Sequence, residues 1–175
     1  MTGPQTYAAW LVLLDQFRAG DDACLEALQG GSIEWTNGVA QRWTRQVSEA
    51  LAARLQALAK QLQTGLDRAG GDAVAISTAL LGARRGLGPL RTFGSLSSFP
   101  APVQAHLQAE LDRWASQTQQ SLERHALQVR HDQGQLLKTI RDHPLQTVAA
   151  TGPAPPAAQT NPDANPPVRG RRVLL

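Results

Sequence analysis

Cysteine is almost absent from this chain of 175 residues, in which Cys24 stands alone. A single thiol excludes an intramolecular disulfide and any zinc site built on several cysteines. Disulfide frameworks belong to oxidising compartments, so one lone thiol is typical of a protein in a reducing compartment. We expect Cys24 to be a small, buried, apolar residue of a short helix rather than a reactive thiol.

Long apolar runs are lacking as well. The run Tyr7–Leu14 is apolar, but it follows no Lys or Arg and ends at Asp15, so it does not have the form of a signal peptide. It is also far shorter than the roughly 20 apolar residues that a membrane span needs. We therefore predict a cytoplasmic protein, for which membrane association is not expected.

Charged residues are sparse. They make up 18% of the chain against 42% hydrophobic residues, and the formal net charge is +3. This charged fraction is low for a fully exposed fibrous helix. We therefore expect the body to pack on itself or on a partner. No segment is as basic as a typical nucleic-acid patch, which leaves nucleic-acid binding open without supporting it.

Motifs of catalysis are also missing. The sequence contains no Gly-x-Ser-x-Gly elbow, phosphate-binding glycine loop or dinucleotide fingerprint. The glycine-rich run 82–88 follows no strand pattern, so we interpret it as the weakening end of a helix. We expect no enzymatic activity and no cofactor.

Histidine is confined to one part of the chain. His106, His125, His131 and His143 lie on or just after the last expected helix. No Glu-x-x-His pair accompanies them, so we predict no metal site. His125 falls on the apolar seam of its helix, where a buried imidazole could respond to pH.

What the chain does contain is helical spacing of apolar residues, which recur every three or four positions. Paired glycines mark the ends of the predicted helices, and an Asp stands where a following helix is predicted to start. Two prolines and a Ser-rich run make 89–101 a predicted loop. The predicted helices cover 5–18, 34–69, 72–88 and 102–142, with a short helix around 24–28.

The two long helices define the expected fold. In the last helix Val103, Trp114, His125 and Leu136 recur at eleven-residue steps, which predicts a nearly straight apolar seam. Helices of such similar length suit an antiparallel pair. We therefore predict an all-α protein: a long antiparallel hairpin of 34–69 and 102–142, with shorter packing helices.

The body and the C-terminal part differ in composition. Residues 1–145 form the predicted helical-bundle domain. Residues 146–175 are rich in Pro, Ala, Asn and Thr with few bulky apolar side chains, so we predict a disordered tail. The tail ends in a short basic and then apolar motif, 169–175.

One short run resembles a known family. The residues of Leu13–Ala23, LLDQFRAGDDA, resemble the opening helices of bacterial extracytoplasmic-function sigma factors. In that family such a run begins the polymerase-binding region. The promoter-melting helices and the helix-turn-helix that should follow have no counterpart in this sequence. We therefore carry over no site residue and assign the chain to no family.

The apolar seams favour a non-enzymatic adaptor or scaffold that acts through protein–protein contact and self-association, as a homodimer or with an unknown protein partner. The tail would serve as a tether carrying a binding motif. The residues that we predict for packing or interface contact are Trp35, Trp43, Leu51, Leu58, Leu107, Trp114 and Leu122.

An alternative function is association with nucleic acid. Arginines gather near one helix end and in the tail, where they could contact phosphates or another anionic partner. The candidates for this contact are Arg84, Arg85, Arg91, Arg169, Arg171 and Arg172. On helix 34–69, Arg42, Arg45 and Arg54 would join them.

Overall fold

The all-α fold is confirmed. A computed structural model describes residues 3–128 and 133–146, and in these ranges it contains six α-helices and no strand. The part of the predicted tail beyond residue 146 lies outside the described residues. The helices are α1 (Tyr7–Ala19), α2 (Cys24–Gln29), α3 (Asn37–Ala69), α4 (Ala73–Gly94), α5 (Ala101–Gln128) and α6 (Gln133–Asp142).

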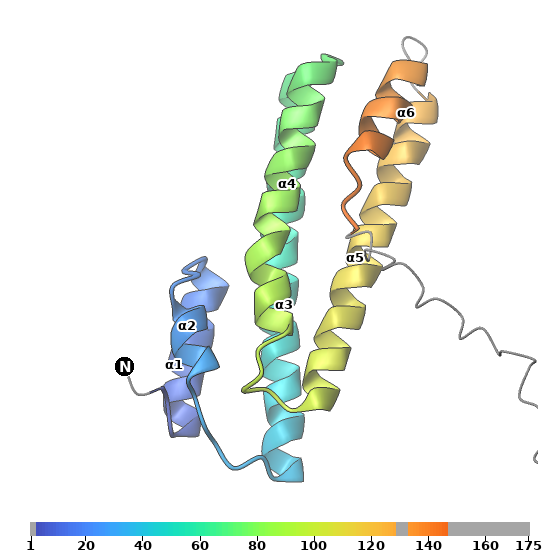
Figure 1. The fold of residues 1–175 in the computed structure, drawn as a ribbon. Helices are drawn as coiled ribbons and strands as arrows, with labels where there is room; N and C mark the ends of the chain where they lie inside the picture. Colours follow the sequence, from blue (N-terminus) through green and yellow to red (C-terminus); the bar gives the residue numbers. More distant parts are fainter. Residues whose placement is uncertain (1–2, 129–132, 147–175) are drawn as a thin grey trace, which may run out of the picture.

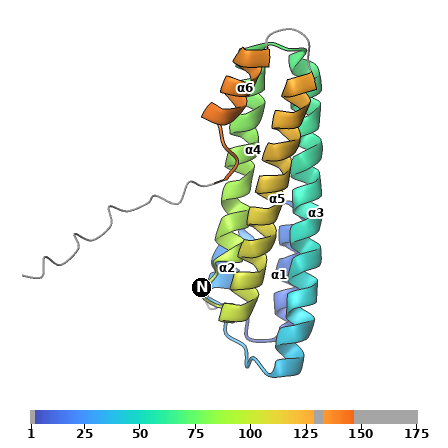
Figure 2. The ribbon, with the colours of Figure 1, turned by 90° about the vertical axis from the view of Figure 1, so that its right-hand side faces the viewer.

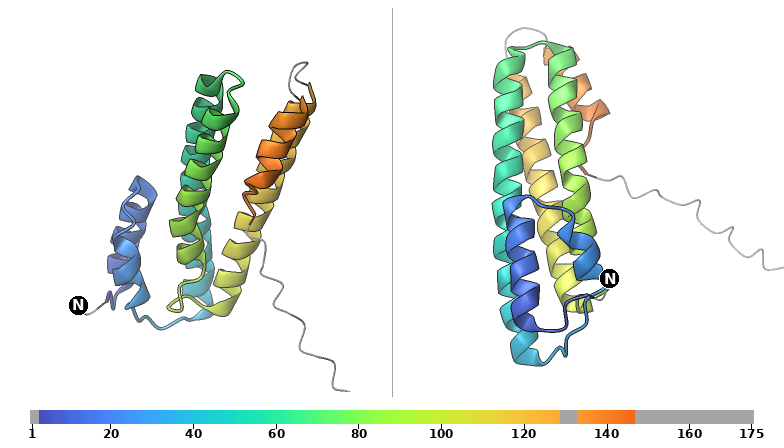
Figure 3. Two further views of the ribbon diagram at one scale, coloured as in Figure 1. Left: turned by 45° about the horizontal axis from the view of Figure 1, so that its top comes forward. Right: turned by 90° about the vertical axis from the view of Figure 1, so that its left-hand side faces the viewer.

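The helices are arranged as three side-by-side pairs. Figures 1 and 3 show α1 with α2, α3 with α4, and α5 with α6, with the α3–α4 pair in the middle layer. The α1–α2 pair covers only the lower half of the middle layer, and α1 contacts α3. On the opposite side, α5 and α6 both contact α4.

The middle pair is a tight antiparallel hairpin. α3 ends at Gly70 and Gly71, whose φ angles of 55° and 99° lie in the left-handed region that glycine tolerates. Asp72 then accepts hydrogen bonds from the amides of Val74 and Ala75 and so caps α4, as predicted. The chain therefore reverses direction within three residues.

α4 is longer than predicted. It continues through Pro89 and ends at Gly94. Proline inside a helix costs about 3 kcal/mol through its lost hydrogen bond and its steric clash. Burying Leu87, Leu90 and Phe93 on one face outweighs this cost, since each such side chain contributes roughly 1.5–3 kcal/mol. The predicted loop shrinks to the residues between α4 and α5.

The helix predicted over 102–142 is divided into α5 and α6. α6 runs back down beside α5 and packs on α4 (Figure 2). α3 and α5 span roughly 50 Å and 42 Å, so an unbroken helix would have overhung the α3–α4 turn. The reversal instead buries Ile140 and Leu145 in the common core.

The order of the pairs also corrects the predicted partner of α3. The antiparallel partner of α3 is α4, whereas α3 and α5 run in the same direction because the chain reverses twice between them (Figures 1 and 2). α3 makes more extensive contact with α4 than with α5. This leaves a loosely filled seam between the two parallel helices.

An aromatic cluster holds the lower end of the three layers together. Trp10 of α1 and Trp43 of α3 are fully buried, with ring centroids 5.2 Å apart in an edge-to-face arrangement. Phe99, between α4 and α5, contacts both of them. Phe17 stacks on Phe93 with centroids 4.0 Å apart. These rings tie the α1–α2 pair to the rest of the body.

Candidate functional site

The predicted packing residues divide into two groups. Trp43, Leu51, Leu58 and Leu107 are buried inside the chain's own core, so they pack within one molecule. Trp35, Trp114 and Leu122 are only partly buried.

Trp35 lies just before α3 rather than inside it. Its indole N–H donates to the Ser98 carbonyl at 3.2 Å, and its ring packs edge-to-face on Trp10. The ring belongs to the aromatic cluster of this chain, and a role of Trp35 in an interface stays a prediction. Trp114, by contrast, lies in the loosely filled seam between α3 and α5.

We call this seam the α3–α5 groove. It consists of two adjoining hollows of about 310 Å³ each. Trp114 and Gln117 line both hollows, so they lie between them. From α3 the groove is lined by Ala52, Leu55, Gln56, Ala59, Leu62, Gln63 and Leu66, and from α5 also by Glu110, Arg113, Thr118, Ser121 and Leu122.

The groove follows from residue size as well as from topology. α3 presents Ala52 and Ala59 to it, and α5 presents Thr118 and Ser121. These short side chains do not reach across two parallel helices that pack chiefly against others. The floor contains the buried Leu55 and the other leucines, while amide and charged side chains stand along the rim. An apolar floor with a polar rim is the usual form of a groove that receives a helix.

A polar cluster lies across the same two helices below the groove. The Nε2 atom of His106 lies 2.9 Å from the Ser48 hydroxyl and 3.2 Å from a carboxylate oxygen of Glu110. A serine–histidine–acid relay requires the acid on one ring nitrogen and the nucleophile on the other. Here both partners share Nε2, so this geometry joins α3 to α5 but does not form that relay.

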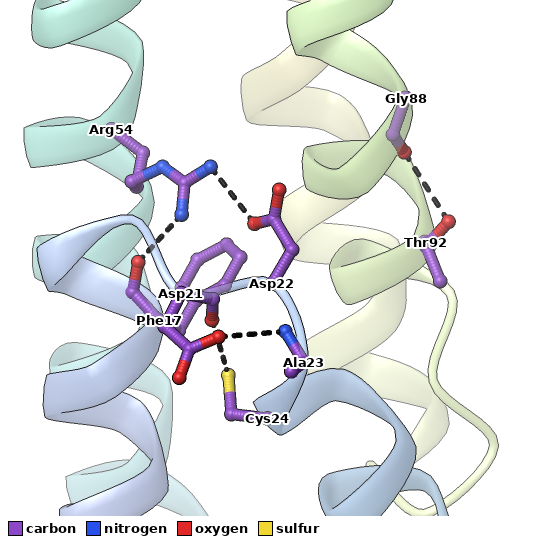
Figure 4. Close-up of polar contacts among 8 residues, drawn as sticks. All are labelled: Phe17, Asp21, Asp22, Ala23, Cys24, Arg54, Gly88 and Thr92. Carbon is purple, nitrogen blue, oxygen red and sulfur yellow. Dashed lines mark hydrogen bonds and ion pairs between the residues drawn. The ribbon is translucent and has the colours of Figure 1, made fainter.

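Arg54, one of the predicted anion contacts, is engaged within the chain. Its guanidinium donates to the Phe17 carbonyl at 2.7 Å and to a carboxylate oxygen of Asp22 at 2.9 Å (Figure 4). The same group lies over the Phe17 ring. Arg54 therefore fixes the α1–α2 pair to α3 and is not free to bind a phosphate.

The other predicted arginines occupy different surroundings. Arg91 donates to the Leu145 carbonyl at 3.1 Å and so holds the end of the described chain against α4. Arg84 and Arg85 are exposed on α4. Arg42 and Arg45 are exposed on α3. The tail residues Arg169, Arg171 and Arg172 lie outside the described residues.

Cys24 is buried, as expected. Its thiol donates to the Asp21 carbonyl at 2.9 Å (Figure 4). Burial raises the pKa of the Cys24 thiol to about 11, and the nearby carboxylates of Asp21 and Asp22 add to the rise. The protonated thiol that dominates at neutral pH is a poor nucleophile.

The three histidines that the structure describes do not converge on one point. His125 is exposed on α5, not buried as its place on the seam suggested. His143 contacts the Thr139 carbonyl through Nδ1, and His131 lies outside the described residues. Within the described ranges, no group of three or more His, Cys, Asp or Glu side chains is placed to hold a metal ion.

None of the helices in the described ranges has both the length and the apolar composition that crossing a bilayer requires. Comparison with family models, with characterised proteins and with solved structures finds no match to this chain.

Proposed function

We propose that the helical body is a non-enzymatic adaptor that self-associates through the α3–α5 groove. The observation that carries this proposal is the partly buried Trp114, which lines both hollows of the groove. Tryptophan in such a position is the residue type that most often dominates the energy of a protein interface.

The shape of the groove supports a second copy of the chain as the partner. A two-fold interface brings the same surface patch of both subunits together, so that patch must be self-complementary. Trp114 between two hollows of equal size meets this condition, since the Trp114 side chain of each copy can enter a hollow of the other. Between Ala52 and Leu66 the groove extends for roughly 21 Å along α3, a length typical of helix–helix contact.

The composition of the groove is also consistent with a protein partner. Leu55, Leu62, Leu66 and Leu122 offer apolar surface, and the glutamines along the rim offer neutral hydrogen-bonding groups. Glu110 and Arg113 of the rim carry opposite charges, so two identical copies need not bring like charges together. A cytoplasmic location belongs to the same proposal, and it is supported by the single buried thiol.

Adjacent alanines on α3 provide a matched test. Ala52 lines the groove, whereas Ala53 is exposed outside it. Ala52→Glu places a carboxylate in the proposed interface, and Ala53→Glu adds the same charge to the same helix away from it. We expect A52E to weaken dimerisation at least about tenfold, because removing the added carboxylate from water in the interface costs several kcal/mol. A53E should dimerise like the unchanged chain.

Light scattering across a range of concentrations measures the oligomeric state of all three proteins, and circular dichroism checks that each remains helical. A chain that is monomeric at every soluble concentration would disprove the proposal. Equal dimerisation of A52E and A53E would place any interface elsewhere.

A further inference from the structure

A further hollow, which we call the end cavity, is lined by the α3–α4 turn and by residues of α3, α4, α5 and α6. Figure 1 shows this turn at the same end of the body as the facing ends of α5 and α6. Its volume is about 330 Å³, and it is partly enclosed. His125 of α5 and the turn residues Gly70 and Gly71 complete its lining. Its walls are aliphatic: Leu66, Ile76, Leu122, Leu136 and Ile140.

The end cavity exists because its surroundings contain little that can fill it. A Cβ atom added at Gly70 or Gly71 would meet nothing within 4 Å. The left-handed φ angles of these residues keep side chains out of the turn. Ile76 and Ile140 are buried, so the walls themselves are held in place by the core. The cavity is therefore built into the fold.

The chemistry of the lining selects against charged ligands. Among the lining residues that the structure describes, there is no carboxylate, lysine or arginine. An ion without a partner in aliphatic surroundings pays a large desolvation cost. His125 is the one polar side chain in the lining, and because it is exposed it stands at the rim. A ligand would thus be mostly hydrocarbon, with one polar group at the mouth.

Size limits the ligand further. An apolar cavity of about 150 Å³ in another protein stays dry and admits benzene. The end cavity is about twice as large and falls at the lower end of the range of small-molecule sites. It has room for roughly eight to twelve carbon atoms by this comparison.

We propose that the end cavity is a binding site for one neutral, largely hydrocarbon small molecule whose single hydroxyl or similar polar group contacts His125. This site is independent of the proposed self-association, although Leu66 and Leu122 line both the cavity and the groove. Tests of the site therefore use residues that line the cavity alone.

Two probes of equal chain length separate neutral from charged ligands. 1-Octanol and octanoate are titrated against the full chain by calorimetry and by thermal unfolding. We expect 1-octanol to bind with a Kd below about 1 mM and to raise the melting temperature. Octanoate should bind at least tenfold more weakly. Absence of octanol binding, or equal binding of the two probes, would overturn the proposal.

Two substitutions locate the binding. Ile140→Phe fills the cavity from α6, and we expect it to weaken octanol binding more than tenfold. Leu136→Phe serves the same purpose if I140F does not fold, since Leu136 is only partly buried. His125→Ala should weaken octanol binding several-fold, and His125→Gln should restore part of it. Octanol binding that survives both cavity-filling variants would place the ligand elsewhere.

A control separates this proposal from the adaptor. A52E lies in the groove and should keep full affinity for octanol. I140F should keep the oligomeric state of the unchanged chain. If A52E instead abolishes octanol binding while I140F does not, the probe occupies the groove and the end-cavity proposal fails, whatever the outcome for self-association.

Discussion

The guanidinium carbon of Arg54 lies 4.9 Å from the centre of the Phe17 ring, and one guanidinium nitrogen donates to the carbonyl of the same residue. A second nitrogen reaches Asp22 beyond the end of α1. Arg54 thus holds the ring, the backbone and the following turn of the N-terminal pair at once. Phe17 in turn stacks on Phe93 of α4, so this contact links three helices.

Replacing Arg54 should therefore loosen the N-terminal pair. We expect Arg54→Met to lower the free energy of unfolding by about 2 kcal/mol, mainly through the lost charge-assisted hydrogen bond to a carbonyl. The contribution of Asp22 should be smaller, because that carboxylate is 40% exposed. Urea unfolding followed by tryptophan fluorescence measures the loss. Arg45→Met, at an exposed position of the same helix, is the control. Equal losses for the two variants would contradict a specific role for Arg54.

The two fully buried tryptophans differ in one hydrogen bond. The indole N–H of Trp10 donates to the Pro4 carbonyl at 3.0 Å, whereas that of Trp43 has no hydrogen-bond partner. Phenylalanine removes similar volume at either position but loses a hydrogen bond only at Trp10. We expect Trp10→Phe to destabilise the protein by about 1 kcal/mol more than Trp43→Phe. Chemical denaturation of both variants measures this difference, and an equal or larger loss for Trp43→Phe would contradict the expected role of the Trp10 hydrogen bond.

The sequence predicted the helices whose apolar residues form a single stripe. On α3 the residues from Trp43 to Leu62 recur every three or four positions, and the structure buries the same stripe. The buried face of α4 was harder to predict, because small and apolar residues of this helix occur on several of its sides. Val74 is apolar, yet this side chain is 73% exposed. The neighbouring helices select the face containing Ile76 and Ala83 instead, and this choice is not encoded within α4 itself.

The candidate site was predictable only in part. Trp114 was recognised as an interface candidate from its place on the apolar seam. The groove around it depends on α3 and α5 being parallel, because the chain reverses once before α4 and once after α4, which continues to Gly94. Proline and glycine propensities argued against so long an α4, but tertiary burial overrode them. The small side chains of the alanines at positions 52 and 59 were the available sequence signal that one face of α3 leaves room for a groove.

Two helical glycines should respond in opposite ways to alanine. A Cβ atom at Gly82 would meet nothing within 4 Å, so Gly82→Ala should raise the free energy of unfolding by about 0.5–1 kcal/mol through helix propensity. A Cβ atom at Gly65 would lie 3.0 Å from the Cβ of Ala79. Neither methyl can rotate away, so Gly65→Ala should push α3 and α4 apart and lower the melting temperature. Thermal unfolding compares the pair, and stabilisation by both substitutions would show that the α3–α4 contact yields easily.

The raised pKa of Cys24 predicts how stability depends on alkaline pH. Below pH 9 the thiol is protonated in the folded and unfolded chains, so it does not make the free energy of unfolding depend on pH. Between pH 9 and about 11 the unfolded chain releases the proton while the folded chain keeps it, so stability falls as pH rises. Other groups titrate in the same window, and comparison with Cys24→Ala removes their shared effect. The difference in free energy of unfolding between the unchanged chain and C24A, measured in urea, should therefore shrink across this range. A difference that stays constant would mean that the thiol ionises as easily in the folded protein as in water.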